Sequence, residues 1–215
     1  MVRKKSVGTR VAAVERLSRR SFLQGSTLAT AAASVFGAGS VLIEQADAAQ
    51  GNGLPMIGPE PTWIALNVNG EPRDVQVEPR MTLAEVLRDR LGLRGTKIAC
   101  NRGACSACTV WLGGLPVCSC MMLAIDVGTR RVTTIEGLAK DGELHPAQSA
   151  FIEHDALQCG FCTPGMIMSC AALLEHEPHP TAADVQDAIS GHLCRCGTYP
   201  HVIAATLAAA RTRKA

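Results

Sequence analysis

The chain has 215 residues, enough for one large domain or two small ones, and 47% of them are hydrophobic, which is ample for a packed core. Only 3% are aromatic, so platforms for stacking nucleic-acid bases are not expected. The formal net charge is +2, but the 14 basic and 16 acidic residues after Ala48 argue against nucleic acid as a partner.

The first 48 residues are typical of an export signal. A basic stretch precedes an uncharged run from Ser21 to Ile43, and Ala46-Asp47-Ala48 provides small residues for cleavage. The run is long enough to span a membrane, but its few large aliphatic side chains weaken the alternative of a permanent anchor. Residues 18–23, Ser-Arg-Arg-Ser-Phe-Leu, resemble the twin-arginine signal. That pathway exports folded proteins, so the resemblance implies a periplasmic protein that meets the membrane only during export.

A linker and a first β-hairpin are expected next. Residues 49–61 contain several Gly and Pro, as linkers do. Hydrophobic alternation from residue 63 to 77, interrupted by Asn69-Gly70, predicts the hairpin. The capping-box pattern of residues 82–85 then predicts a helix through about Leu91.

A second hairpin and a last strand complete the predicted sheet. Residues 109–112 and a strand carrying Cys118 and Cys120 flank the turn Gly113-Gly114. Residues 131–135 predict the last strand. Since residues two apart on a strand face the same side, both thiols are expected on one face.

The remainder of the chain is predicted to be helical. Residues 137–144 are expected to connect two domains, and four short helices form a bundle after them. Cys170 falls on the apolar face of the second helix and is predicted to lie in the core. The helix starts are marked by Pro146, Pro164, Thr181 and Pro200.

The cysteines are clustered, since none of the ten occurs in the first 99 residues. Disulfides, zinc and iron–sulfur clusters are the competing explanations. Cys100, Cys105 and Cys108 have the C-x4-C-x2-C spacing of plant-type [2Fe–2S] proteins. The small residues between them let backbone N–H groups approach an anionic cluster. Spacing alone leaves open whether Cys118 or Cys120 is the fourth ligand.

A second set consists of the pairs Cys159/Cys162 and Cys194/Cys196. Both pairs precede predicted helices, whose N-terminal N–H groups and dipoles favour negative charge and lower the pKa of a thiol. Zinc is the main alternative occupant of such a four-thiolate site. Disulfides are disfavoured because two cysteines in a C-x-C pair rarely bridge to each other.

The two cysteine sets, in this order on a sheet followed by helices, resemble the small iron–sulfur subunit of the molybdenum hydroxylases, the xanthine dehydrogenase and aldehyde oxidoreductase family. With its leader the chain is most similar to periplasmic aldehyde oxidoreductase small subunits, and the isoquinoline oxidoreductase type is also similar. The resemblance covers roughly residues 60–213. It implies an α+β fold: a β-grasp ferredoxin-like domain over residues 62–136 and a four-helix bundle over residues 145–215.

The resemblance also implies which residues bind each group. It favours Cys120 over Cys118 as the fourth outer ligand. Gln158 and Cys196 would contact the molybdopterin of a large subunit. The implied ligands are Cys100, Cys105, Cys108 and Cys120 for an outer [2Fe–2S] cluster, and Cys159, Cys162, Cys194 and Cys196 for an inner one.

Some positions depart from the family pattern. Ser106 stands where Gly is common, and His192 stands where Asn is common before the Leu-Cys-Arg-Cys run, so His192 is a candidate for a hydrogen bond to the inner cluster. Cys118 and Cys170 are additional thiols, without a role in the pattern.

The function implied by the resemblance is electron transfer. Electrons would pass from the molybdopterin of the large subunit through both clusters to a FAD-binding subunit or a cytochrome, during oxidation of an aldehyde or an N-heteroaromatic compound. No substrate site is expected on this chain. The alternatives are a free-standing two-cluster electron carrier and an exported structural domain held by zinc or disulfides.

Overall fold

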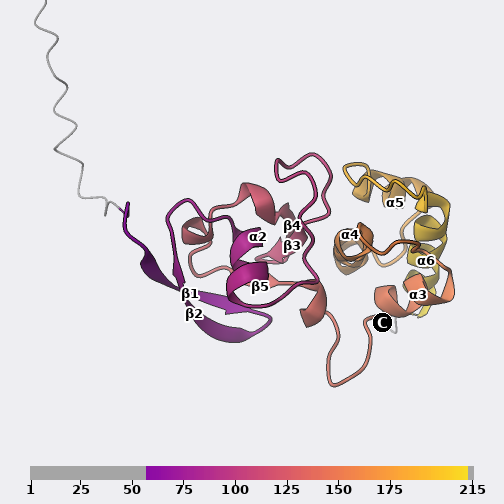
Figure 1. Cartoon of the computed structure of the whole chain (residues 1–215). Helices are drawn as coiled ribbons and strands as arrows, with labels where there is room; N and C mark the ends of the chain where they lie inside the picture. Colours follow the sequence, from indigo (N-terminus) through magenta and orange to yellow (C-terminus); the bar gives the residue numbers. More distant parts are fainter. Residues whose placement is uncertain (1–56, 213–215) are drawn as a thin grey trace, which may run out of the picture. The chain divides into compact units, whose positions relative to one another are not determined.

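The computed structural model describes residues 57–212, which belong to one compact unit (Figure 1). The predicted export signal, residues 1–48, lies outside this range, as does most of the predicted linker. Within residues 57–212, no helix combines the length and the hydrophobicity needed to cross a membrane.

A five-stranded mixed sheet forms the first half, with the strand order β2-β1-β5-β3-β4. β5 runs parallel to β1 and antiparallel to β3. This sheet and the helices that follow it agree with the predicted α+β class. The strands are β1 (Thr62–Val68), β2 (Glu71–Val77), β3 (Thr109–Leu112), β4 (Leu115–Cys118) and β5 (Arg131–Thr133).

Both predicted hairpins are present. Asn69 (φ 56°) and Gly70 (φ 88°) connect β1 to β2, and Gly113 (φ 61°) and Gly114 (φ 90°) connect β3 to β4. Positive φ at both central residues is the property of the tight turns that match the twist of antiparallel strands. Asn and Gly tolerate these angles best, so the turn residues determine where each hairpin folds.

The predicted helix after β2 begins with the expected capping box but changes its winding. Thr82 Oγ1 accepts a hydrogen bond from the Glu85 N–H (3.3 Å), and the Glu85 carboxylate accepts one from the Thr82 N–H (2.8 Å). α2 (Leu83–Glu85) then continues as the π-helical segment η1 (Val86–Arg90). The fully buried Leu83 and Leu87 face the sheet, where each stabilises the fold by about 1.5–3 kcal/mol.

The prediction that one strand carries both Cys118 and Cys120 is wrong. β4 ends at Cys118, and Cys120 lies in the short 3-10 helix η2 (Ser119–Met121). The backbone turns because Ser119 donates twice to the carbonyl oxygen of Cys108, from its N–H (3.3 Å) and from its hydroxyl (2.6 Å). The two thiols therefore lie in different environments.

β5 is shorter than the predicted strand. It ends at Thr133, and the 3-10 helix η4 (Ile135–Gly137) begins at Ile135. The Asn69 side chain accepts a hydrogen bond from the Thr134 N–H (2.8 Å), which satisfies a backbone donor where pairing within the sheet ends. A second 3-10 helix, η3 (Ala124–Asp126), precedes β5.

Four helices follow, close to the predicted starting points. Phe151, Met166, Leu174 and Val202 are fully buried in their shared core. α3 packs most extensively against α6, and α4 contacts α3, α5 and α6. The helices are α3 (Pro146–Glu153), α4 (Thr163–His176), α5 (Ala182–Ala188) and α6 (Tyr199–Thr212).

The sheet and the helices contact each other through α4, which packs against β3 and β4 (Figure 1). The indole N–H of Trp111 on β3 donates to the carbonyl oxygen of Met168 on α4 (2.8 Å). Ile135 also packs against the helical core. Trp111 also packs against the helical core, so it joins the sheet and the helices by both apolar contact and a hydrogen bond.

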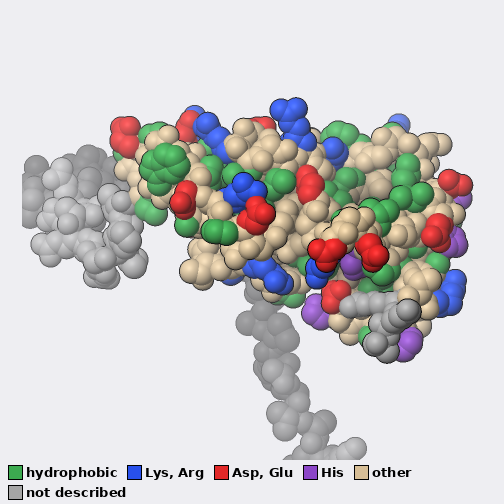
Figure 2. All heavy atoms as spheres, turned by 90° about the horizontal axis from the view of Figure 1, so that it is seen from below, with side chains coloured by type: hydrophobic (Ala, Val, Ile, Leu, Met, Phe, Trp, Pro, Cys, Tyr) green, Lys and Arg blue, Asp and Glu red, His purple; other side chains and the backbone are tan. Residues whose placement is uncertain are grey.

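Acidic and basic side chains are interspersed on the face drawn in Figure 2, with hydrophobic side chains between them. This distribution agrees with the near balance of charge after Ala48. Nucleic-acid binding generally requires a clustered basic surface, and this face does not provide one.

Candidate metal centres

The outer cysteine loop directs backbone N–H groups toward sulfur atoms. The N–H groups of Arg102 and Ala104 donate to Cys100 Sγ, at 3.4 Å and 3.2 Å. The N–H of Gly103 donates to Cys120 Sγ at 3.4 Å. Hydrogen bonds of this kind stabilise thiolates, as a cluster ligand requires.

The outer loop contains three residues with positive φ, Asn101 (φ 49°), Gly103 and Ser106. Gly103 has a φ of 71°, and an added Cβ there would lie 2.9 Å from Met121 Cγ. Ser106, where the family commonly has Gly, also has a positive φ, of 56°. Glycine adopts such angles without strain, whereas serine does so at some cost. Gly would therefore be less strained than Ser at position 106.

The outer thiols interact in two pairs. The Arg102 N–H, followed by the Cys105 thiol, lowers the pKa of Cys100 to about 7. Burial, followed by contact with the neighbouring Cys120 thiol, raises the pKa of Cys108 to about 12. Cys100 therefore adjoins Cys105, and Cys108 adjoins Cys120.

Cys118 lies near this site but has a different polar neighbour. Its sulfur is 3.7 Å from Ser106 Oγ, and its thiol contributes only the last of the effects on the pKa of Cys108. None of the N–H groups that donate to Cys100 or Cys120 donates to Cys118. The hydrogen bonds therefore favour Cys120 as the fourth thiolate.

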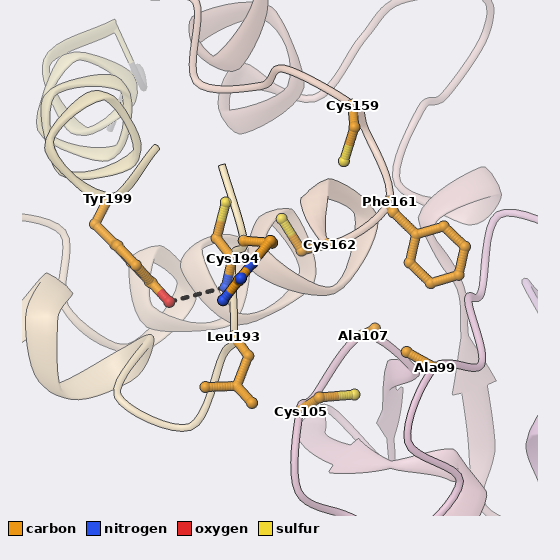
Figure 3. A pocket seen from close by; sticks show the side chains of 10 residues that line it. Ala99, Cys105, Ala107, Cys159, Phe161, Cys162, Leu193, Cys194 and Tyr199 are labelled. Carbon is orange, nitrogen blue, oxygen red and sulfur yellow. Dashed lines mark hydrogen bonds between the residues drawn. The ribbon is translucent and has the colours of Figure 1, made fainter. Parts of the chain in front are cut away.

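Three of the four inner cysteines line a pocket of about 420 Å³ (Figure 3). Cys159 and Cys162 come from the loop before α4, and Cys194 comes from the loop before α6. Figure 3 shows these three sulfur atoms with Phe161 and Tyr199 at the same pocket. The structure thus brings together two loops that are far apart in the sequence.

The inner thiols also interact in two pairs. Burial, followed by contact with the Cys194 thiol, raises the pKa of Cys162 to about 12. Burial raises the pKa of Cys194, but hydrogen bonds from Thr198 and Cys162 outweigh it and lower that pKa to about 7. The backbone of Cys159 lowers the pKa of Cys196, but the Cys159 thiol and desolvation outweigh it and raise the pKa overall.

A structural zinc site and a [2Fe–2S] cluster use four thiolates in different ways. Within residues 57–212, no group of three or more His, Cys, Asp or Glu side chains could hold one metal ion. Zinc in a structural site needs four ligands around one ion, whereas a [2Fe–2S] cluster distributes four thiolates over two irons. Four cysteines at each site would supply this number of thiolates.

Two buried polar atoms close to the inner cysteines lack hydrogen-bond partners. They are the hydroxyl of Thr163, directly after Cys162, and Nδ1 of His192, two residues before Cys194. An anionic group with acceptor sulfurs would suit unsatisfied donors at this position. Both the donor set and its surroundings thus fit an iron–sulfur cluster.

The inner loop is held by His192, which the sequence singled out, and by Ser169 and Tyr199, which it did not. His192 is 4% exposed, and its Nε2 lies 2.7 Å from Ser169 Oγ. Burial lowers the pKa of His192 to about 4, so the ring is neutral. The Tyr199 hydroxyl accepts from the Cys194 N–H (2.8 Å) and donates to the His192 carbonyl (3.0 Å). For Tyr199, the only sequence signal was its position directly before a helix-starting proline.

Three further residues can be placed in the structure. Cys170 is fully buried in the helical core, and burial raises its pKa to about 11, as expected for a core thiol. His145 caps α3 through Nδ1, which accepts from the Ala147 N–H (3.2 Å). Gln158 is exposed beside the inner loop. Its contact with molybdopterin stays a prediction.

Comparisons with known proteins agree with the two sites. Residues 66–127 match the 2Fe-2S iron-sulfur cluster binding domain, and residues 134–207 match the [2Fe-2S] binding domain. The beta subunit of the 6-hydroxypseudooxynicotine dehydrogenase complex of Paenarthrobacter nicotinovorans is 45% identical over 151 residues, covering 70% of this chain and 94% of that subunit.

Another relative matches over more of the chain. The aldehyde oxidoreductase iron-sulfur-binding subunit of Escherichia coli is 39% identical over 204 residues, covering 88% of this chain and 86% of its own. Among solved structures, quinoline 2-oxidoreductase from Pseudomonas putida 86 has a TM-score of 0.68 and 42% identity, over 70% of this chain and 94% of that one. The chain therefore belongs to the iron–sulfur small subunits of the molybdenum hydroxylases.

Proposed function

We propose that this chain is the electron-transfer subunit of a periplasmic molybdenum hydroxylase that oxidises aldehydes or N-heteroaromatic compounds. The observation that carries the proposal is that outer-loop N–H groups donate to Cys100 and Cys120 Sγ, while Cys159, Cys162 and Cys194 line one pocket, in a chain of this family. Bound [2Fe–2S] clusters supply one-electron carriers at these sites. Chemistry at the substrate carbon belongs to the partner.

The exposed apolar residues beside the inner site support a large partner subunit. Phe161 is 47% exposed, and Leu193 is 62% exposed. Large apolar side chains gathered at one surface often mark an interface. Covering them would place Gln158 and Cys196 next to the molybdopterin of that subunit. The same residues argue against a free-standing carrier, for which a solvated surface is expected here.

The outer site supports release of electrons to a second partner. Met121, which packs against Gly103 of the outer loop, is 65% exposed, and Arg102 is exposed on the same loop. An acceptor that contacts this loop would come close to the outer thiols. A FAD-binding subunit or a cytochrome would serve this role.

The export and domain predictions complete the proposal. The twin-arginine pattern in residues 1–48 supports transport of a chain already loaded with its clusters. We infer a β-grasp ferredoxin-like domain over residues 62–136 and a four-helix bundle over residues 145–215, with residues 137–144 as the connector. The contacts among α3, α4, α5 and α6 support this interpretation of the second domain.

Purification of the tagged chain from the periplasm of its native host tests the proposal. The expected preparation is coloured, contains iron and labile sulfide, and includes a second chain with molybdopterin. Recovery of the tagged chain from the cytoplasm and not from the periplasm would contradict export. An iron-containing chain without a molybdenum partner would support the free-standing carrier, and a colourless chain with zinc would support the structural domain.

A further inference from the structure

The two cysteine sites meet at a backbone hydrogen bond. The N–H of Leu193 donates to the carbonyl oxygen of Cys105 at 3.2 Å. Cys105 belongs to the outer cysteine set, and Leu193 directly precedes Cys194 of the inner set. Both residues line the pocket shown in Figure 3. One hydrogen bond thus joins the loops that carry the two sets.

A second contact beside it requires a glycine. An added Cβ at Gly165, in the first turn of α4, would lie 2.4 Å from the carbonyl oxygen of Ser106 and 3.2 Å from backbone atoms of Ala107. A Cβ atom essentially never lies within 3.0 Å of such an atom, so the backbones would have to move apart. Gly165 is therefore needed for space, because the outer loop rests directly on α4.

On the outer-loop side of this contact, the Ser106 carbonyl oxygen is held in place. The Ser106 carbonyl oxygen accepts hydrogen bonds from the N–H (3.2 Å) and the hydroxyl (2.7 Å) of Thr109, which begins β3. Moving this oxygen would disturb bonds that connect the loop to the sheet. Overpacking at such a position displaces backbone atoms that the surrounding bonds hold in place.

The inner side is fixed as well. The Tyr199 hydroxyl bridges the His192 carbonyl and the Cys194 N–H, and His192 is bonded to Ser169 on α4. These bonds hold the residues before and after Leu193. The contact therefore lies between two loops that are each tied to a regular element.

We propose that the intersite contact, formed by Cys105, Ser106, Ala107, Gly165 and Leu193, sets the separation between the outer and inner clusters. Gly165 and Leu193 would be positioning residues, acting through the loops rather than on the clusters. The inference rests on the proposed function, because it requires both clusters to be bound. Magnetic coupling between two reduced clusters falls steeply with their separation, so this distance can be monitored without measuring turnover.

The test compares Gly165→Ala with wild type in the purified complex, reduced with dithionite and examined by EPR at low temperature. The expected result is two cluster signals at full intensity, with the splitting from their mutual coupling reduced or lost. Gly191→Ala is the matched control. Its added Cβ would meet only the Ser106 hydroxyl, at 3.3 Å, which can rotate away, so the splitting should remain.

A second variant covers the case in which Gly165→Ala fails to assemble. Tyr199→Phe removes only the hydroxyl that bridges His192 and Cys194, and it should reduce the splitting while iron content is retained. An unchanged splitting in either fully loaded variant would overturn the inference alone. A wild-type complex without two distinct cluster signals would overturn the proposed function and this inference with it.

Discussion

Cys118 and Cys120 differ in what their sulfur atoms meet, although only one residue separates them. The Gly103 N–H donates to Cys120 Sγ, and Cys120 pairs with Cys108. Cys118 faces the Ser106 hydroxyl. The two hydrogen bonds from Ser119 to the Cys108 carbonyl produce this difference, because they turn the chain between the two thiols.

Serine substitution of each thiol tests this choice of ligand. Cys120→Ser should lose the outer cluster, and the iron content should fall from about four to about two atoms per chain. Cys118→Ser should keep both clusters, because it removes a neighbour rather than a ligand. Iron analysis and EPR of the two variants provide the measurement. A Cys118→Ser protein that loses iron, beside a fully loaded Cys120→Ser protein, would reverse the assignment.

At the residue scale, the spacing of the cysteines predicted the candidate ligands but not the side chains that support them. The C-x4-C-x2-C pattern and the two later pairs were sufficient to nominate the thiols, since short loops limit where such residues can point. The bond of His192 with Ser169 joins residues 23 positions apart that share no sequence pattern and become neighbours only when α4 packs against the inner loop. The bond of Tyr199 with Cys194 spans five residues of one loop, but the sequence does not show where the Tyr199 hydroxyl points.

The helices and strands were predicted best where a capping motif or a tight turn of nearby residues marks their ends. The capping boxes at Thr82 and Thr181 and the turn at Asn69-Gly70 are formed by residues within four positions of each other. The π-helical segment Val86–Arg90 was not predicted. The Leu91 N–H bonds to the carbonyl of Val86, five residues earlier, and hydrophobic periodicity does not specify that change of winding.

Trp111 is expected to couple the unfolding of β3 and α4. Trp111→Phe keeps an aromatic ring but removes the hydrogen bond to the Met168 carbonyl, so the free energy of unfolding should fall by about 1 kcal/mol. Chemical denaturation of the loaded protein measures this change. Trp63→Phe is the control, because Trp63 on β1 is 67% exposed and should change stability by less than about 0.5 kcal/mol. Equal effects of both substitutions would contradict the coupling.

At the scale of the whole molecule, substitution of Gln158 tests whether this residue contacts the molybdopterin of the large partner subunit. Gln158→Ala should leave both clusters and the stability unchanged, because the side chain is exposed, while lowering the molybdopterin content of the purified complex. Gln186→Ala, at an exposed position on α5, is the control and should retain the cofactor. Equal molybdopterin content in both complexes would remove Gln158 from the interface with the cofactor.

The arrangement of the whole molecule was the least predictable level. β5 pairs with β1, more than sixty residues earlier, and the outer loop rests on Gly165 of α4. These contacts depend on packing between distant segments, which local patterns do not encode. Family resemblance provided the overall plan, but the reason for Gly165 emerged only from the positions of atoms around it.

The strand order has a consequence for association with other chains. β2 and β4 form the two edges of the sheet, and each contains a proline, Pro72 and Pro116. Because a proline within an edge strand faces its nitrogen away from the neighbouring strand, both edges lack a donor there. An incoming strand would leave a carbonyl unmatched at either edge, which disfavours edge-to-edge aggregation. Contact with other proteins is thereby directed to the loops and helices.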